Sequence, residues 1–308
     1  AADGATLKGI RIGGDLILAP GVTKDVTLVD CVIQGNIRNY GTGEVRFEAP
    51  QITPESTATK PSDVYKPGTT LDRTLEYGGK SVPIYRDRPL NVFSDVDFIW
   101  TDEENENRRR LEYLGGEFRT RYGIDVSSFQ GEIDWDAVAD DNIDFAMVRV
   151  GFRGTGTGSL NTDKYYEQNI RGAMRAGLET GVYFFAQAVT VEEAIEEADY
   201  VISLLDGPVA YDWEMHDSTY RVYGTSPEMA TACAVAFCER IKDAGYTPMV
   251  YGGTYVTYMK YDQGALADYL SWYPEYKSEK SEKLCPTLVY HMDYWQFSSS
   301  RAVAGING

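Results

Sequence analysis

The chain has 308 residues, 43% of them hydrophobic, and a formal net charge of −18 at pH 7. That length can hold two domains with a sizeable core in at least one of them. The acidic excess argues against nucleic acid as a partner. No apolar run approaches the ~20 residues that a membrane-spanning helix needs.

Residues 1–50 are predicted to form a small β-rich accessory module. Short stretches of β-type composition alternate with the turn signals Gly-Gly, Pro-Gly and Gly-Thr-Gly. The expected strands are residues 7–12, 15–18, 26–29, 31–37 and 44–47. Their length and spacing fit either a small β-sandwich or a few coils of a β-solenoid, and no clear repeat decides between the two.

Residues 51–121 are predicted to connect this module to the rest of the chain. Up to residue 86 the segment is rich in Pro, Thr, Ser and Lys, which is typical of a linker or an extended strap. Residues 87–121 form a lead-in with apolar stretches at 90–93 and 96–100 and a charged run at 102–110. The mixed signs of that run indicate a solvated turn or a short helix.

From Tyr122 onwards, short apolar strands alternate with amphipathic helices. Thr190 and Ser226 are predicted N-caps, and Gly177 and Gly245 are predicted to end helices. Repeated βα units imply a parallel sheet, and their number suggests a closed α/β barrel of the TIM type. The part after residue 270 is strand-rich and helix-poor, so we expect an irregular barrel. The expected strands are 145–150, 181–186, 208–213 and 248–251, and the expected helices are 165–176, 191–205 and 227–244.

Asp212 and Glu214 stand at the carboxyl end of the expected strand 208–213. Side chains alternate along a strand, so the two carboxyl groups point the same way. Such a pair on a buried strand is costly unless it is paired or used. Glycoside cleavage uses one carboxyl group to protonate the leaving oxygen and another to handle the developing positive charge. The spacing alone is a weak signal, because acidic pairs at strand ends are common.

The four cysteines are too few and too scattered for a disulfide framework. Cys233 and Cys238 are five positions apart on an expected helix, which places them on different sides of it, so we predict no bridge between them. No Cys/His cluster has metal-ligand spacing, and His216 and His291 are isolated. No metal and no cofactor is therefore predicted. His216 follows the acidic pair, where a supporting role and a plain loop position are both open.

Residues 122–135, Tyr-Gly-Ile-Asp-Val-Ser-Ser-Phe-Gln-Gly-Glu-Ile-Asp-Trp, resemble the opening of glycoside hydrolase family 25. These are the Chalaropsis-type lysozymes, or N-acetylmuramidases, of bacteria, phages and fungi. Later pieces follow in the family's order at residues 145–153, 181–185, 211–214, 250–253, 294–299 and 303–306. The resemblance covers residues 122–308 and does not explain residues 1–86.

The resemblance implies an irregular α/β barrel and cleavage of the β-1,4 bond between N-acetylmuramic acid and N-acetylglucosamine. It also implies roles for three acidic residues. Glu214 would be the general acid, Asp212 would orient the 2-acetamido group, and Asp125 would complete the acidic floor. From the residues alone, Asp125 could equally cap its own backbone in an Asx turn.

Five aromatic residues are expected at strand ends, where flat rings with polar tips suit sugar faces and hydroxyl groups. Some of them are expected to serve packing instead of binding. Trp135 is more suited to anchor the first helix than to bind substrate. Together with Gln296, the predicted substrate-binding residues are Tyr183, Tyr211, Tyr251, Trp272 and Trp295.

The spacing of Asp212 and Glu214 leaves their carboxyl groups roughly 5–7 Å apart, which does not separate retaining from inverting chemistry. The substrate carries a nucleophile of its own in the N-acetyl oxygen. We therefore expect substrate-assisted cleavage with retention of configuration.

Two other functions remain open from the sequence. A cell-wall binding module would keep the barrel and lose catalysis. A hydrolase of chitin-like N-acetylglucosamine polymers would use the same acetamido chemistry. The two readings are separated by turnover of purified wall and by the identity of the new reducing ends.

The expected partner is the glycan strand of peptidoglycan, which places the protein outside the cell or at the cell wall. The start, Ala1-Ala2-Asp3-Gly4, contains no secretion signal, so we expect that one has been removed. Residues 1–86 are expected to contact the wall or a protein partner. Residues 1–121 carry a net charge of −3 and residues 122–308 a net charge of −15, so the first part is better suited to approach an anionic wall.

Overall fold

The computed structural model of the protein divides into two compact units, Ala1–Thr57 and Ala58–Gly308. It describes residues 4–8, 11–12, 16–29, 32–33, 37–40, 42–48, 59–101, 104–205 and 209–306. Predicted strand and linker positions at residues 9–10, 15, 31, 34–36, 51–58 and 208 lie outside the described residues.

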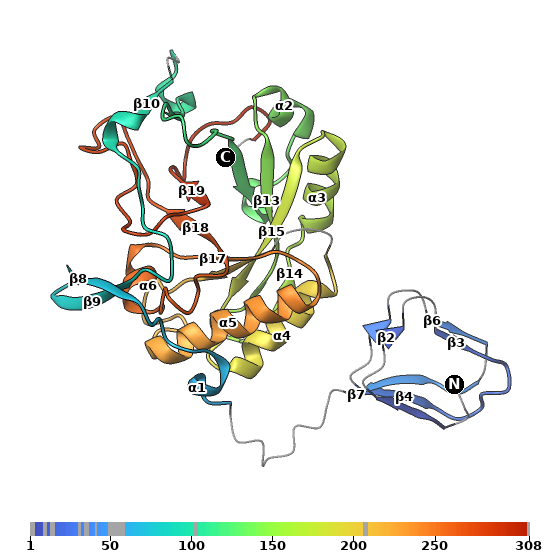
Figure 1. Ribbon diagram of the computed structural model, residues 1–308. Helices are drawn as coiled ribbons and strands as arrows, with labels where there is room; N and C mark the ends of the chain where they lie inside the picture. Colours follow the sequence, from blue (N-terminus) through green and yellow to red (C-terminus); the bar gives the residue numbers. More distant parts are fainter. Residues whose placement is uncertain are drawn as a thin grey trace. The chain divides into compact units, whose positions relative to one another are not determined.

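The first unit contains short strands, and every pairing among its described residues is parallel (Figure 1). Paired residues are 21 positions apart in three of the ladders, as in Thr6 with Thr27 and Leu16 with Ile37. Parallel pairing of successive chain turns is typical of solenoid coils, whereas sandwiches are antiparallel. The strands are β1 Thr6–Lys8, β2 Arg11–Ile12, β3 Leu16–Leu18, β4 Val26–Val29, β5 Val32–Ile33, β6 Ile37–Asn39 and β7 Val45–Glu48. Leu16, Leu18, Val22, Val26 and Leu28 form its small apolar core.

The second unit is built on a parallel sheet whose seven main strands follow one another in chain order (Figure 1). A short antiparallel strand, β14 Leu160–Thr162, pairs with β13. The main strands are β12 Gly123–Val126, β13 Phe145–Arg153, β15 Glu179–Ala186, β16 Val209–Trp213, β17 Pro248–Tyr251, β18 Leu270–Pro274 and β19 Tyr294–Gln296.

The sheet is curled but open, which corrects the prediction of a closed barrel. Among the described residues, β12 pairs only with β13 and β19 pairs only with β18, so these two strands are the edges. Closure requires eight strands of matched length and stagger. The last three strands have only three to five residues, and no helix stands between β18 and β19, where all residues are described. The irregularity expected after residue 270 is therefore enough to leave the barrel half-formed.

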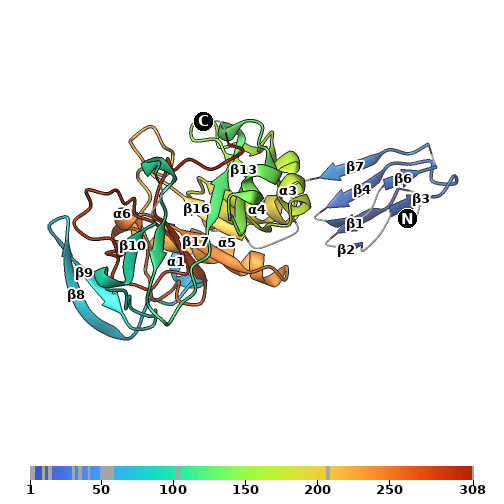
Figure 2. The same cartoon turned by 90° about the horizontal axis from the view of Figure 1, so that it is seen from above.

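Five helices of the second unit follow strands of the sheet, and α4 and α5 lie side by side against it (Figures 1 and 2). The predicted caps are confirmed: the Thr190 hydroxyl accepts from Glu193 N at 3.2 Å and the Ser226 hydroxyl from Met229 N at 3.2 Å. Gly177 and Gly245 adopt positive φ angles of 84° and 91° after α3 and α5. The helices are α2 Trp135–Asp140, α3 Tyr166–Arg175, α4 Val191–Ile202, α5 Pro227–Asp243 and α6 Thr254–Met259.

Residues 59–121, for which the sequence predicted a linker or strap and a lead-in, belong to the second unit and pack against the rest of it. The short helix α1 Pro61–Val64 lies beside α5 (Figure 1). Strands β8 Leu71–Tyr77 and β9 Lys80–Tyr85 form an antiparallel hairpin. Val82 and Ile84 of β9 are buried against a cluster that contains Tyr258, Tyr273 and Tyr290. This hairpin is therefore part of the core of the second unit.

The rest of this segment continues along the same unit. Arg88 is buried and donates to the carbonyl oxygens of Leu266 and Tyr269. Strands β10 Phe98–Trp100 and β11 Leu111–Tyr113 form a second antiparallel pair, and Phe98 packs edge-to-face on Trp295 at 5.5 Å. The charged run that precedes β11 contains a single 3-10 turn, Glu106–Arg108, as expected for a solvated turn or short helix.

Two further predictions are confirmed. Cys233 and Cys238 are free and buried in α5. A lipid bilayer could not be spanned by any helix in the part of the chain that the structure describes.

The packing of the hairpin predicts different effects for two truncations. A chain that begins at Ala58 keeps every buried contact of the second unit, so its Tm should equal that of the same transition in the full chain. A chain that begins at Asp87 loses Val82 and Ile84 from the core. Burial of each side chain contributes about 1.5–3 kcal/mol, so Tm should fall by roughly 10 °C. Calorimetry of both chains measures this, and equal Tm values would show that the hairpin does not stabilise the unit.

Candidate active site

The predicted acidic residues line one cleft of about 1410 Å³ in the second unit. Asp125 lies on β12, Asp212 lies on β16 and Glu214 follows β16 directly. Gln296 ends β19 and lines the same cleft. Because these strands are parallel, their carboxyl ends meet at one edge of the sheet, which is where open α/β sheets bind ligands.

Asp212 is 6% exposed and carries the largest electrostatic strain of the site. Its pKa is raised well above the usual value by burial, by the charge of Glu214 and by a hydrogen bond shared with Glu214. Two carboxyl groups can share a hydrogen bond only when one of them holds a proton. Oδ1 of Asp212 is buried and accepts no hydrogen bond from any donor among the described residues. This oxygen therefore has an unused capacity to accept a hydrogen bond.

Asp125 is held from the opposite edge of the sheet. Gln296 Nε2 donates to Asp125 Oδ2 at 2.7 Å, and the hydroxyl groups of Tyr251 and Tyr276 donate to Gln296 Oε1 at 3.3 and 3.1 Å. Burial raises the pKa of Asp125, and the hydrogen bond from Gln296 opposes that effect.

The turn after Asp125 is capped by other residues. The Ser127 hydroxyl accepts from Phe129 N at 3.2 Å and the Asp163 carboxylate accepts from Ser128 N at 3.0 Å. The Asp125 carboxyl group lines the cleft and also accepts a hydrogen bond from its own backbone N–H, so the local backbone contact and the place in the cleft occur together.

The side chain of Glu214 is 26% exposed, whereas Asp212 is buried. His216 Nε2 lies 2.6 Å from Glu214 Oε2, and its ring packs on Tyr220 at 5.2 Å. The sequence leaves open whether His216 supports the acidic pair or is a plain loop residue. The structure shows a direct contact with Glu214.

Four of the five predicted aromatic residues line the cleft: Tyr183, Tyr251, Trp272 and Trp295. Trp272 meets Tyr183 and Tyr251 edge-to-face, with ring centroids 5.9 and 5.0 Å apart. Burial raises the pKa of Tyr183 well above the usual value, with further contributions from Asp125 and Asp212, so its phenol stays protonated.

Tyr211 is not placed for substrate contact, contrary to the prediction. Its side chain is fully buried and packs on Phe237 of α5, with ring centroids 4.6 Å apart. Alternation along β16 explains this, because Asp212 faces the cleft and its neighbours Tyr211 and Trp213 face the helices.

Phe129 is a cleft residue that the sequence did not single out. Its ring is 83% exposed and lies over the guanidinium of Arg149 at 5.1 Å. The guanidinium of Arg149 is held by the Asp163 carboxylate at 2.7 Å and donates to the Ser128 hydroxyl at 3.1 Å. A large aromatic ring held rigidly in water is typical of a ligand-binding surface. Only its place in the turn after Asp125 could have drawn attention to it.

No group of three or more His, Cys, Asp or Glu side chains with the arrangement of a metal site occurs among the residues that the structure describes. In the cleft, Asp212 shares a hydrogen bond with Glu214, and Asp125 accepts one from Gln296.

The model of the family described as glycosyl hydrolases family 25 matches residues 124–306. The chain belongs to this family. All three acidic residues of the cleft lie inside the matched region, whereas the first unit and residues 58–121 lie outside it.

The comparisons with individual proteins agree with this assignment. The chain is 25% identical over 187 residues to the autolytic lysozyme of Clostridium acetobutylicum, covering 60% of this chain and 53% of that protein. It is 26% identical over 196 residues to lysozyme M1 of Streptomyces globisporus, covering 60% and 64%. The chain thus spans between half and two thirds of the length of these relatives.

One solved structure supports the fold. The crystal structure of the spore cortex lytic enzyme SleM of Clostridium perfringens matches with a TM-score of 0.50 at 22% identity, over 60% of this chain and 63% of that chain.

The raised pKa of Asp212 predicts a pH-dependent stability difference. Below about pH 3.8, the usual pKa of Asp, the residue is neutral in both the folded and the unfolded chain. Above it the unfolded chain ionises freely while the folded chain resists, so wild-type stability falls relative to Asp212→Asn as pH rises. Asp212→Asn should therefore raise Tm by a few degrees at pH 7, and the gain should vanish near pH 4.

Thermal melts across this pH range test the expectation. The exposed substitution Asp243→Asn controls for the loss of one negative charge. A wild type more stable than Asp212→Asn at pH 7 would mean that ionised Asp212 is well stabilised in the fold.

Proposed function

We propose that the protein is a muramidase that cleaves the β-1,4 bond between N-acetylmuramic acid and N-acetylglucosamine in peptidoglycan. The proposal draws on family membership and on the lysozymes to which the chain is similar. The observation that carries it is the Asp212–Glu214 pair, in which a buried carboxyl group shares a hydrogen bond with a more exposed one.

In the first step, Glu214 gives its proton to the glycosidic oxygen as the C1–O bond breaks. The acetamido carbonyl oxygen of the muramic acid residue attacks C1 and forms an oxazolinium ion. Asp212, which lines the cleft, accepts the acetamido N–H and stabilises the positive charge of this ion. Burial of Asp212 makes that interaction stronger than it would be in water.

In the second step, the Glu214 carboxylate takes a proton from water, and the water oxygen attacks C1 as the oxazolinium ring opens. The acetamido oxygen and the water attack C1 from opposite faces of the sugar. These two successive inversions restore the original configuration, so the product is the β-anomer. Asp125 and Gln296 keep the opposite side of the cleft polar and ordered.

The cleft aromatics supply the surface for the sugar rings in this proposal. Tyr183, Tyr251, Trp272 and Trp295 line the interior. Phe129, supported by Arg149, offers an exposed ring face at the rim. Flat apolar faces of this kind stack on the C–H faces of sugars, while the tyrosine hydroxyl groups can bond sugar oxygens.

Removal of the proton donor tests the proposal. Peptidoglycan is digested with wild type and with Glu214→Gln, and the new reducing ends are labelled with borohydride. We expect N-acetylmuramitol from the wild type and a rate at least ~10²-fold lower for the variant, because general acid catalysis is lost.

Other results of the same labelling experiment would support one of the two alternative functions. N-acetylglucosaminitol, or faster cleavage of chitin oligomers, would favour the chitin-like specificity. Binding without any new reducing ends would favour the cell-wall binding module.

We further propose that the protein acts outside the cell and that its first unit contacts the wall or a protein partner. The hairpin at residues 71–85 belongs to the core of the second unit, so the targeting role falls to residues 1–57. The weaker net charge of the N-terminal part of the chain suits an anionic wall.

This role predicts a split between two substrates. A chain that begins at Ala58 should keep its turnover on short soluble glycan fragments within about twofold, since the cleft is intact, and it should sediment less with intact walls. Equal sedimentation of both chains with walls would contradict the targeting role.

A further inference from the structure

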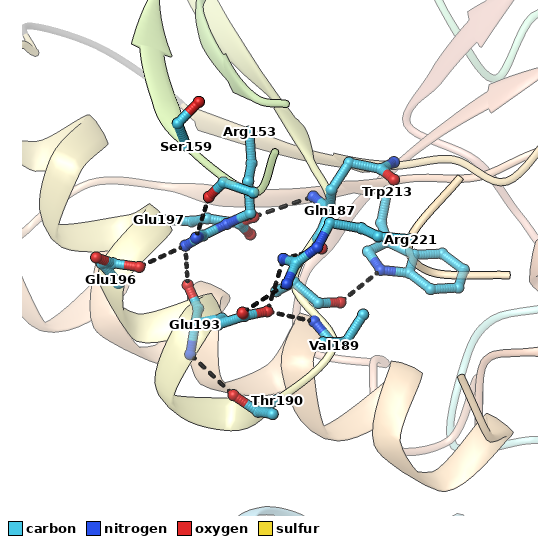
Figure 3. Close-up of polar contacts among 12 residues, drawn as sticks. Arg153, Ser159, Gln187, Val189, Thr190, Glu193, Glu196, Glu197, Trp213 and Arg221 are labelled. Atoms are coloured by element: carbon cyan, nitrogen blue, oxygen red, sulfur yellow. Dashed lines mark hydrogen bonds and ion pairs between the residues drawn. The ribbon is translucent and has the colours of Figure 1, made fainter. Parts of the chain in front are cut away.

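A buried charge cluster behind the sheet fixes the loop between β15 and α4, residues 187–190 (Figure 3). Arg153 is 4% exposed and Glu197 is fully buried, and Arg153 Nε lies 2.7 Å from Glu197 Oε1. The same carboxylate oxygen accepts from Gln187 N at 3.0 Å. The ion pair between β13 and α4 therefore holds the first residue of the loop by its backbone.

A second ion pair holds the loop from its other side (Figure 3). Arg221 donates to both carboxylate oxygens of Glu193, at 2.8 and 2.9 Å, and to the carbonyl oxygen of Gln187 at 2.9 Å. Glu193 also accepts from Val189 N at 2.8 Å. Both backbone polar groups of Gln187 are thus bound to charged side chains, which leaves the loop little freedom.

The loop in turn holds the end of β16. Pairing between β15 and β16 ends at Ala186 with Trp213, one residue before Glu214. Beyond that point the side chain of Gln187 continues the connection, because its Nε2 donates to the carbonyl oxygen of Glu214 at 2.9 Å. Trp213 Nε1 donates to the carbonyl oxygen of Ala188 at 3.1 Å. The backbone that carries Glu214 is thus anchored to this loop by two hydrogen bonds.

Gln187 occupies its position at a cost to stability. The side chain is completely buried, and Oε1 has no hydrogen-bond partner among the described residues. A buried polar atom without a partner destabilises the folded state. The one side-chain hydrogen bond that Gln187 makes there goes to Glu214, so positioning that residue explains why an amide is buried here.

We propose that Gln187 is a positioning residue for Glu214. The buried Arg153–Glu197 pair acts through Gln187 to fix the position of the Glu214 carboxyl group. This inference rests on the proposed role of Glu214 as proton donor. Displacement of a catalytic group by about 1 Å can cost ~10²-fold in rate without changing substrate contacts. Loss of the positioning contact should therefore lower kcat and leave KM nearly unchanged.

Gln187→Met tests this directly, because Met has a similar volume and no donor. We expect kcat to fall about 10-fold or more, KM to stay within about twofold, and Tm not to fall, since an unsatisfied buried oxygen is removed. Glu197→Gln should change kcat in the same direction.

Glu196→Gln is the matched control. Glu196 also binds Arg153, at 2.8 Å, but its side chain is 61% exposed, and among the described residues no hydrogen bond joins it to Gln187. It should keep wild-type kcat, because exposed ion pairs contribute little.

A spectroscopic readout separates this inference from the proposed function. The indole N–H resonance of Trp213, assigned with Trp213→Phe, reports the anchor between the loop and β16. It should shift in Gln187→Met and Glu197→Gln and stay in place in Glu196→Gln, even if wild type turns over no peptidoglycan.

The inference is overturned if Gln187→Met keeps wild-type kcat, if KM rises as much as kcat falls, or if the Trp213 resonance is unmoved. It is also overturned if Glu196→Gln is as impaired as Glu197→Gln. Absence of turnover in wild type, with the Trp213 resonance shifted as expected, would sink the proposed function alone.

Discussion

The cleft depends on one electrostatic constraint, which is that Asp212 must be buried beside a second carboxyl group. An isolated carboxylate in such a place is strongly disfavoured, and the charge of Glu214 makes ionisation harder still. The arrangement persists because the two groups share a hydrogen bond, and because the positive charge of Arg149 partly offsets the cost. Stability is given up to hold a proton between the two carboxyl groups, and the proposed mechanism passes this proton to the glycosidic oxygen.

Charged side chains are paired with opposite charges behind the sheet but not in the cleft. Behind the sheet, Arg153 and Arg221 pair with Glu197 and Glu193 at 2.7 to 2.9 Å. In the cleft, none of the three acidic residues has a direct arginine or lysine partner among the described residues, and Glu214 contacts Asp212 and the imidazole of His216. Paired charges make a rigid scaffold, while carboxyl groups without a fixed cation remain free to exchange protons.

Local signals predicted the second unit well, because its helices begin and end at residues whose chemistry is explicit. Thr190 and Ser226 cap as expected, and the acidic pair faces one cleft as strand alternation requires. The same alternation could have excluded Tyr211 from the cleft. The sequence prediction of a linker or strap misses the hairpin at residues 71–85. Gly78-Gly79, with φ angles of 58° and 74°, is nevertheless a strong hairpin signal.

Other features depend on contacts between distant parts of the chain, and no local pattern predicts them. Among the described residues, β12 and β19 do not pair, and they are the open edges of the sheet. A side-chain hydrogen bond between Asp125 and Gln296, which are 171 positions apart in the chain, joins these two strands. Glu197 is one of several acidic residues on α4, and its burial follows only from the position of Arg153 on β13. Phe129 is visible as a binding surface only once Arg149 is seen beneath it.

The anomeric configuration of the first product tests the role of the Asp212–Glu214 pair most directly. A soluble β-linked fragment of peptidoglycan is cleaved in the NMR tube, and the anomeric proton signals are followed before mutarotation. The β-anomer should form first, because the acetamido oxygen and then water attack C1 in two displacements. A first-formed α-anomer would contradict the substrate-assisted account and would require Asp212 or another group to activate water for a single displacement.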